Sequence, residues 1–363
     1  MATVLERVPW ESSLLDPTPD QSLEQYARRK NGMVNPAVRY FTPVPWLARA
    51  IVDLHPEYGL LMRLEQSVAD LVALVVSQEN SCRFCYAAVR VMLWSQGMSL
   101  ARIQRVEHDL TQADLPSRAT AAMVFARNQS RKGPAAAREA REGATRAGFT
   151  VDEMKEIAFV VGVTDFSNRA TTITAVPARE FERIPERLHM RLLRPLMGRL
   201  LRSRYSRGRP TPLEQAPSHP CAPIVNAYAG SPIAVALERT LQEMWDSPHV
   251  TRRCKLLMFA VVARGLGCDL CAPSFRQELE AEGVSNETLT QVLTHLDAPA
   301  LDDVERLLVG FARETIWYEP APLQRRARAL RERLTNAQVL EAIGVAAMAN
   351  GLCRMGAMVL DQQ

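Results

Sequence analysis

The stretch that decides the fold is RLEQSVADLVALVVSQEN, residues 63–80, which runs directly into SCRFC, residues 81–85. Its apolar residues are dense enough and spaced as expected for a buried helix. A second stretch of the same kind, TRRCKLLMFAVVARGLG at 251–267, runs into CDLC at 268–271. The chain therefore contains, twice, a predicted buried helix followed by a C-x-x-C pair.

The likeness of these two stretches extends along the chain as an internal repeat. A shift of 186 residues superposes Cys82 on Cys268, Cys85 on Cys271, Arg90 on Arg276, FAR at 125–127 on FAR at 311–313, and Pro134 on Pro320. A shift of 185 then superposes Thr150 on Thr335, Glu156 on Glu341, and Arg169 on Arg354. One single-residue gap over so long a span is typical of a duplicated domain. We predict an N-terminal extension (1–30), a first repeat (31–176), a linker (177–222) and a degenerate second repeat (223–363).

Local signals make both repeats helical. Ser81 is a predicted N-cap of a helix that runs to about Gln96, and Gly97 is its predicted stop. Pro134 and Pro320 suit the first turns of later helices. Capping boxes, Thr150 with Glu153 and Thr335 with Gln338, are predicted to open the last long helix of each repeat. Strand patterns are essentially missing, so the predicted fold is all-α, with two tandem helical bundles.

The composition is that of an ordinary globular protein, with 47% hydrophobic and 23% charged residues. No apolar run reaches membrane-spanning length, and the first residues lack the apolar stretch of a signal peptide. We therefore expect a cytoplasmic protein. Seven cysteines are too few and too unevenly placed for a disulfide framework, so in a reducing compartment the close pairs are candidates for catalysis or metal binding.

Basic charge is concentrated between Pro177 and Pro210, where ten arginines stand against three glutamates. The segment ERLHMRLLRPLMGRLLRSRYSRGRP, residues 186–210, predicts an amphipathic helix interrupted at Pro195 and Gly198 and followed by a loose tail. Such a segment fits an anionic membrane surface or nucleic acid. It also fits a solvated linker whose apolar side packs on a neighbour. We favour the linker and expect no nucleic-acid partner.

The first cysteine pair has the spacing of a redox centre. Cys82 and Cys85 are three residues apart at a predicted helix start, close enough for a disulfide. A helix N-terminus stabilises negative charge, so we expect depressed pKa values for these thiols, aided by Arg83 and Arg90. The alternative for any single cysteine is a small buried hydrophobic residue.

The helix-then-C-x-x-C unit, the later FAR…P…T-x-x-E block and DFSNRATTITAVP at 165–177 resemble the alkylhydroperoxidase AhpD-like and carboxymuconolactone decarboxylase family. The resemblance covers both halves and implies an all-helical oligomer, here a homotrimer of the two-domain chain. It implies reduction of a hydroperoxide, or exchange of a disulfide substrate, at the expense of a thiol reductant and without cofactor or metal. It further implies that Cys85 attacks and Cys82 resolves, with Cys271 and Cys268 as their counterparts.

The sequence departs from that family at the proton relay. The family's glutamate is replaced by Asp70 in the first copy and by Leu256 in the second. The family's histidine is replaced by Val89 and Phe275. Asp70 and Glu79 are the acids we propose as proton acceptors in the first copy, with a solvated or N-cap-paired carboxylate as the alternative. Thiol–disulfide exchange tolerates the loss of a base better than peroxide reduction does.

The second pair is the weaker candidate. Pro273 favours a helix that begins near itself, which leaves Cys271 outside the helix, and Asp269 disfavours a thiolate there. We therefore predict that the first pair is active and the second vestigial or structural. Three alternatives remain: a four-cysteine zinc site, a decarboxylase, and a non-catalytic scaffold with decayed sites.

Several other polar residues have a structural role as an alternative to a functional one. His55 is expected to cap the end of a helix rather than to catalyse. Asn168 and Arg169 are candidates for a pocket lining or a subunit contact. Arg169 and Arg354 also suit a repeated ion pair with Glu156 and Glu341.

Overall fold

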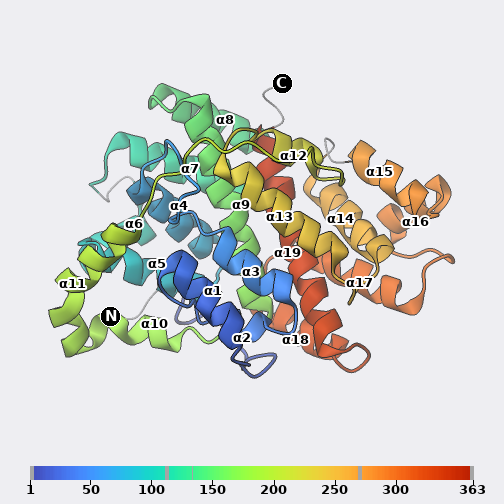
Figure 1. The fold of residues 1–363 in the computed structure, drawn as a ribbon, viewed down its shortest axis with the longest axis horizontal. Helices are drawn as coiled ribbons and strands as arrows, with labels where there is room; N and C mark the ends of the chain where they lie inside the picture. Colours follow the sequence, from blue (N-terminus) through green and yellow to red (C-terminus); the bar gives the residue numbers. More distant parts are fainter. Residues whose placement is uncertain (1–3, 111–113, 133, 269–271, 360–363) are drawn as a thin grey trace.

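The computed structural model describes residues 4–110, 114–132, 134–268 and 272–359, and this part of the chain is helical with no β-strand (Figure 1). The all-α prediction is confirmed. Three helices precede α4, the helix that leads into the first cysteine pair: α1 (Gln21–Asn31), α2 (Val38–Phe41) and α3 (Pro45–Asp53). The rest of the first half contains α4 (Gln66–Glu79), α5 (Arg83–Ser95), α6 (Leu100–His108), α7 (Ser117–Lys132), α8 (Pro134–Arg146) and α9 (Val151–Ile173).

The predicted linker contains α10 (Arg179–Arg183), the 3₁₀ turn η2 (Ile184–Glu186) and α11 (Leu188–Arg204). The second half contains α12 (Ala222–Asn226), α13 (Pro232–Asp246), α14 (Arg252–Leu266), α15 (Ala272–Ala281), α16 (Asn286–His295), α17 (Asp303–Glu314), α18 (Pro320–Leu330) and α19 (Asn336–Val359).

The predicted capping boxes form at both long helices. The Thr150 hydroxyl accepts from the Glu153 N–H at 3.2 Å, and the Glu153 carboxylate accepts from the Thr150 N–H at 2.9 Å. Thr335 and Gln338 make the same two bonds, at 3.2 and 2.9 Å. Each box satisfies helix N–H groups that would otherwise have no partner, which fixes where α9 and α19 begin. Pro134 and Pro320 open α8 and α18, as predicted.

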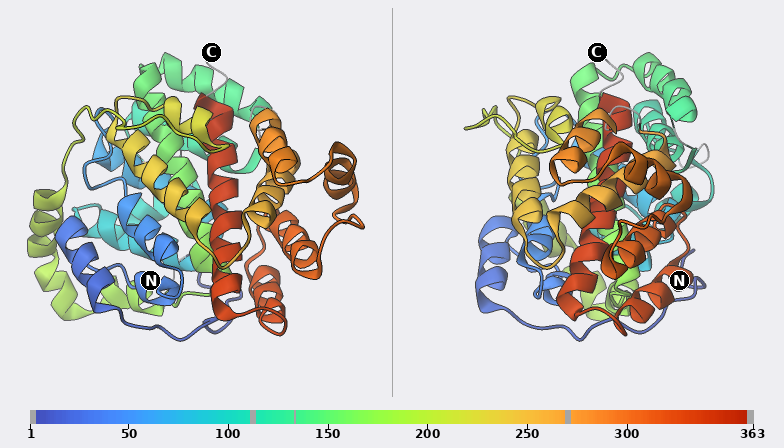
Figure 2. Two further views of the ribbon diagram at one scale, coloured as in Figure 1. Left: turned by 45° about the vertical axis from the view of Figure 1, so that its right-hand side comes forward. Right: turned by 90° about the vertical axis from the view of Figure 1, so that its right-hand side faces the viewer.

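The long helices α9 and α19 lie side by side at the centre of the molecule (Figures 1 and 2). They approach closely at Gly162 and Gly351, because a Cβ on Gly351 would lie 2.4 Å from the Gly162 carbonyl oxygen. One hydrophobic core extends through both halves around this contact. Among the described residues, α19 alone is long and apolar enough to span a membrane, but 89% of its apolar window is buried within the protein, as in the core helix of a soluble protein.

A buried polar network joins the two central helices, and it corrects the predicted ion pairs. Asp165 pairs with Arg169 at 2.5 Å and lies 3.5 Å from Arg354. Burial lowers the pKa of Arg354 to about 10. Glu156 instead accepts backbone N–H bonds from residues 62–64, and Glu341 pairs with a lysine of α14. The repeated glutamates therefore do not pair with the repeated arginines.

The prediction of a helix interrupted at Pro195 and Gly198 is wrong, because α11 is continuous through both residues. A proline inside a helix removes one backbone hydrogen bond. Contacts with the end of α5 on both sides of the proline hold the helix together. Arg194 Nε donates to the Trp94 carbonyl at 2.8 Å, and Arg202 Nη1 donates to the Gln96 carbonyl at 3.2 Å.

After α11 the chain returns along the loop that follows α3. A bridge pair joins Tyr58 and Ser206, and the Ser206 N–H donates to the Glu57 carbonyl. The Gly208 N–H donates to the Leu61 carbonyl at 2.8 Å. The linker thus supports the loop that carries one wall of the site described below.

Candidate redox site

The first cysteine pair lies at a tight junction between α4 and α5. Ser81 has φ of 51°, the left-handed conformation that ends many helices. The Ser81 N–H donates to the Gln78 carbonyl and the Cys82 N–H to the Ser77 carbonyl, both at 3.0 Å, which is the Schellman pattern. Because Ser81 ends α4 in this way, it does not cap α5 as predicted. Cys82 is the N-cap, and its sulfur accepts the Cys85 N–H at 3.4 Å.

The two thiols share one hydroxyl of α9. Thr171 Oγ1 lies 3.3 Å from Cys82 Sγ and 3.2 Å from Cys85 Sγ. The same hydroxyl is 2.7 Å from the Ser167 carbonyl, one helical turn back. Both cysteines are free thiols; Cys82 is fully buried, and Cys85 is partly exposed. The α9 helix therefore holds both sulfur atoms in one hydrogen-bonded group.

The environment separates the acidities of the two thiols. Burial opposes ionisation of Cys82, but hydrogen bonds from Cys85, Thr171, Thr172 and the Cys85 N–H outweigh it and lower its pKa to about 7. Burial and the neighbouring Cys82 raise the pKa of Cys85 well above its ordinary value. The pair thus shares a proton at neutral pH, with negative charge favoured on the helix-capping sulfur.

Arg83 and Arg90 do not supply the positive charge that we predicted for these thiols. Arg83 makes a bidentate contact with Glu182 of α10, at 2.9 and 3.0 Å. Arg90 is buried and pairs with Glu107 at 3.0 Å. Each guanidinium already has a carboxylate partner, so the lowered pKa comes from hydrogen bonds at the helix start.

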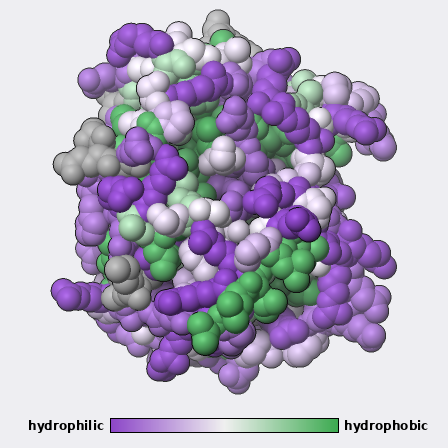
Figure 3. Space-filling view, turned by 90° about the vertical axis from the view of Figure 1, so that its left-hand side faces the viewer, coloured by the Kyte–Doolittle hydropathy of each residue, from purple (hydrophilic) through white to green (hydrophobic). Residues whose placement is uncertain are grey.

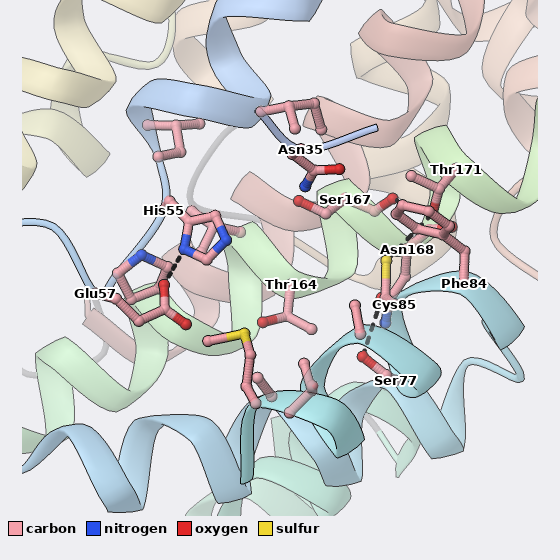
Figure 4. A pocket seen from close by; sticks show the side chains of 18 of the residues that line it. Asn35, His55, Glu57, Ser77, Phe84, Cys85, Thr164, Ser167, Asn168 and Thr171 are labelled. Atoms are coloured by element: carbon pink, nitrogen blue, oxygen red, sulfur yellow. Dashed lines mark hydrogen bonds and ion pairs between the residues drawn. The ribbon is translucent and has the colours of Figure 1, made fainter. Parts of the chain in front are cut away.

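Cys85 opens onto a pocket of about 100 Å³ between α3, α4, α5 and α9 (Figure 4). An apolar cavity of about 150 Å³ accommodates benzene, so this pocket suits a small molecule or the end of a longer one. Cys85, Asn168 and Thr171 line one end; His55 and Glu57 line the other, with Thr164 between them (Figure 4). Val89, where the resemblance implies a histidine, is part of the apolar wall.

His55 was expected to cap α3, but its ring lines the pocket and contacts the Glu57 carboxylate through Nδ1. Burial lowers the pKa of His55 to about 4, so the imidazole is neutral at pH 7. With Nδ1–H facing the carboxylate, Nε2 is free to accept a hydrogen bond. The pocket therefore contains a histidine after all, supplied by the end of α3.

Asn168 places an unused donor in the pocket. Its side chain is fully buried, and Oδ1 accepts from the Ser77 hydroxyl at 3.2 Å. No hydrogen-bond partner is found for Nδ2 among the described residues. A buried donor without a protein partner is costly, so Nδ2 is available to donate to a water or a small molecule in the pocket. Arg169, the neighbour of Asn168, faces the buried network instead of the pocket.

Two residues from the second half of the chain contact the part of α9 that carries Asn168 and Thr171. Tyr318, just before α18, donates to the Asn168 carbonyl at 2.7 Å and contacts the Thr172 hydroxyl. Gln324 of α18 donates to the Thr172 carbonyl at 2.8 Å. Sequence reasoning missed both residues, because nothing near them in the sequence marks a contact with α9.

Asp70 and Glu79 do not line the pocket. Asp70 accepts from Gln66 at 2.9 Å and from Gln96 at 2.8 Å. Gln96 lies beyond the far end of α5, a rise of about 16 Å from Cys85. Glu79 pairs with Arg127 of α7 at 3.0 Å. Neither carboxylate is therefore placed to take a proton directly from Cys85.

The burial of Asp70 is expected to make the free energy of unfolding depend on pH. Burial raises the pKa of Asp70 to about 6, against hydrogen bonds from Gln96 and Gln66 that lower it. In the unfolded chain the carboxyl ionises near pH 4. Between these values the native state holds an extra proton, so the free energy of unfolding falls by about 3 kcal/mol as the pH rises from 4 to 7. In Asp70→Asn this fall is expected to disappear. Urea unfolding of both proteins across this range tests it, and parallel pH curves would contradict it.

The second pair is only partly described. Cys268 is buried beside a separate pocket of about 350 Å³, and Cys271 lies outside the described residues. The following helix begins at Ala272, which agrees with the start predicted near Pro273. Phe275, at the second histidine position, stacks on Phe259 at 5.3 Å between ring centroids. Within the described ranges no group of three or more histidine, cysteine or acidic side chains is arranged to hold a metal ion.

Comparisons of the chain with protein-family models, with curated proteins and with solved structures found no match.

Proposed function

We propose that the protein is a thiol-dependent oxidoreductase that reduces hydroperoxides, or exchanges disulfides, through Cys82 and Cys85. One arrangement supports this most: two free thiols share the Thr171 hydroxyl, hydrogen bonds lower the pKa of Cys82 to about 7, and Cys85 faces a pocket. A pair of buried structural cysteines needs neither the lowered pKa nor the pocket.

In this proposal Cys82 replaces the missing base. The proton of the Cys85 thiol moves to the Cys82 thiolate, which leaves a thiolate on the sulfur that faces the pocket. Because the two sulfur atoms are hydrogen-bonded neighbours, the transfer needs no intervening group. This proton transfer explains how Cys85 could be activated although no described carboxylate or histidine is placed to take its proton directly.

Reduction of a hydroperoxide begins with the Cys85 thiolate. The Cys85 thiolate attacks the outer oxygen of a hydroperoxide, the O–O bond breaks, and Cys85 becomes a sulfenic acid. The alkoxide leaves and takes the proton held by Cys82. The Cys82 thiolate attacks the Cys85 sulfur, a disulfide forms, and hydroxide leaves as water after taking a proton from solvent. A dithiol reductant restores both thiols and is itself oxidised to a disulfide.

Disulfide exchange uses the same two sulfur atoms. The Cys85 thiolate attacks one sulfur of a substrate disulfide and releases the other sulfur as a thiolate, which leaves a mixed disulfide. Cys82 then attacks the Cys85 sulfur, the second substrate thiolate leaves, and the protein holds a Cys82–Cys85 disulfide while the substrate is reduced to two thiols. The small pocket favours hydroperoxides over protein disulfides, because only a compact group reaches Cys85.

The experiment that tests the function starts from the fully reduced protein. A slight excess of an organic hydroperoxide is added, remaining thiols are alkylated, and peptide masses locate any disulfide. We expect rapid formation of a Cys82–Cys85 disulfide while Cys221, Cys254 and Cys353 stay reduced. If the first pair is alkylated at the same rate and to the same extent as the other thiols, the proposal fails, and a non-catalytic scaffold is favoured.

The shared proton predicts a specific pH profile. With one ionisation near pH 7, the rate of Cys85 oxidation is expected to rise about tenfold from pH 6 to pH 8 and then level off. An ordinary thiol with a pKa near 8.5 continues to rise steeply above pH 8. Stopped-flow rates in matched buffers distinguish the two curves, and a rise that continues to pH 9 contradicts the proton transfer.

Asn168 is expected to assist the departure of the alkoxide. Asn168 lines the pocket with Cys85, and its Nδ2 has no hydrogen-bond partner among the described residues. Asn168→Leu removes the donor at similar volume, and the rate of Cys85 oxidation by hydroperoxide should fall about a hundredfold. Ser77→Ala is the matched control: it removes the partner of Oδ1 but keeps Nδ2. Equal rates in the wild type and Asn168→Leu would exclude this role.

A further inference from the structure

The helix α11 presents a row of leucines to solvent. Leu188, Leu192, Leu196 and Leu200 are four residues apart, and their exposed fractions are 72%, 75%, 63% and 50%. Leu193 adds a fifth side chain, 46% exposed. Residues at this spacing follow one face of a helix. A hydrophobic ridge crosses the lower part of the face on which α11 lies (Figure 3).

The opposite face of α11 is fixed to the protein. Gly198 is buried against α5, because a Cβ there would lie 2.3 Å from the Ser95 carbonyl oxygen. Arg194 donates to the carbonyls of Trp94 and Met98, at 2.8 and 3.2 Å. Since these contacts set the rotation of the helix, the leucines cannot turn inward without breaking them.

The charge carried by α11 and by the tail that follows it has one sign. Residues 187–210 contain eight arginines and no aspartate or glutamate. Seven of these arginines are exposed, all except Arg194. Arg187 and Arg199, at the start and middle of the helix, form no ion pair with a described residue. The surface is therefore apolar along its crest and cationic along its flanks.

We propose that α11 docks on an anionic lipid surface, with its axis parallel to the bilayer and its leucines in the headgroup–acyl boundary. An amphipathic helix with leucines on one face and arginines beside them is suited to this arrangement. Anionic headgroups neutralise the arginines while the leucines leave water. Two copies of this chain pairing through α11 would instead bring two all-basic surfaces together. The proposal rests on α11 alone and is independent of the thiol chemistry.

The test is flotation of the full-length protein with vesicles. One set contains phosphatidylcholine alone, and the other contains about 30 mol % phosphatidylglycerol, to give an anionic surface. We expect binding to the anionic vesicles, weak binding to the neutral ones, and release at about 1 M salt, where charge attraction is screened.

Two variants separate the apolar and electrostatic contributions. Leu192→Gln/Leu196→Gln is expected to weaken binding at least tenfold, because it removes the two apolar side chains at the centre of the leucine row. Arg187→Gln/Arg199→Gln is expected to weaken it at least tenfold, since each basic residue near such a surface contributes a factor of about five. Val151→Gln, an exposed apolar site at the start of α9, is the control and should bind as wild type.

Three results would overturn the proposal. The first is equal binding to neutral and anionic vesicles. The second is binding that the leucine variant leaves unchanged. The third is a dimer in sedimentation that the leucine variant dissociates while vesicles stay unbound, which would make α11 an interface between copies.

Discussion

Replacing Glu341 by glutamine is expected to lower the free energy of unfolding by about 3–5 kcal/mol. Glu341 and Lys255 form an ion pair at 2.7 Å in which both side chains are fully buried. Lys255 Nζ also donates to the carbonyls of Met244 and Ser247, and Ser247 Oγ donates to the Glu341 carboxylate. Removing one charge leaves an ammonium ion in the core without its counter-ion, which is the costly arrangement.

The pH dependence of this variant provides a second readout. Burial lowers the pKa of Lys255, and Glu341 opposes that effect. Without Glu341 the folded protein holds the lysine proton less tightly than the unfolded chain does, so the stability of Glu341→Gln should rise from pH 7 to pH 10 relative to wild type.

An exposed pair of a carboxylate and a basic side chain provides the control. Asp152 and Arg63 pair at 2.9 Å, but their side chains are 55% and 57% exposed. Asp152→Asn should therefore cost less than about 1 kcal/mol in the same urea titration. A Glu341→Gln loss as small as that of Asp152→Asn would contradict the argument that burial sets the cost.

The helix boundaries were predictable because their signals are local. Thr150 with Glu153, and Thr335 with Gln338, carry in four residues everything that a capping box needs. Ser81 shows the limit of this reasoning. Its hydroxyl suits an N-cap, but Ser81 adopts the left-handed conformation that ends α4 in a Schellman motif. The N-cap of α5 is therefore the next residue, Cys82.

The buried ion pairs were not predictable from the repeat. Pairing the recurring glutamates with the recurring arginines assumed that a repeated function uses repeated residues. In the structure both arginines approach Asp165, whose counterpart at a shift of 185 is Asn350, an uncharged residue. The glutamates Glu156 and Glu341 bind different partners in their own halves. Which carboxylate meets which cation is decided by how α9 and α19 pack.

The site was predictable only in part. The spacing of Cys82 and Cys85 marked the thiols, and DFSNR marked Asn168 as a pocket candidate. His55 and Tyr318 come from the end of α3 and from the segment before α18, far from the thiols in sequence. A pocket assembled from such distant segments leaves no local signal. The position of Asp70, which matches the glutamate that the resemblance implies, therefore predicts a proton acceptor that the fold places elsewhere.

Replacing Cys85 by serine is expected to reduce hydroperoxide turnover by at least about a thousandfold, because the sulfur that faces the pocket is lost. Replacing Cys82 by serine should also stop turnover, but after a single oxidation. In that variant Cys85 can still be oxidised, more slowly because its proton acceptor is gone, and no thiol is present to resolve the sulfenic acid. Cys254→Ser, a change at a buried thiol away from the pocket, is the control and should turn over as wild type.

A sulfenic-acid trap followed by peptide mass analysis separates the roles of the two thiols. A trapped adduct on Cys85 in Cys82→Ser, with none on Cys82 in Cys85→Ser, is the expected result. The opposite pattern would mean that the more acidic sulfur attacks directly, although it is fully buried, and that the protein opens to admit substrate. Acidity alone favours Cys82 as the attacking group and exposure alone favours Cys85. Proton transfer from Cys85 to Cys82 makes acidity and exposure compatible. The buried Cys82 sulfur carries the negative charge at rest, and the exposed Cys85 sulfur carries it when substrate is attacked.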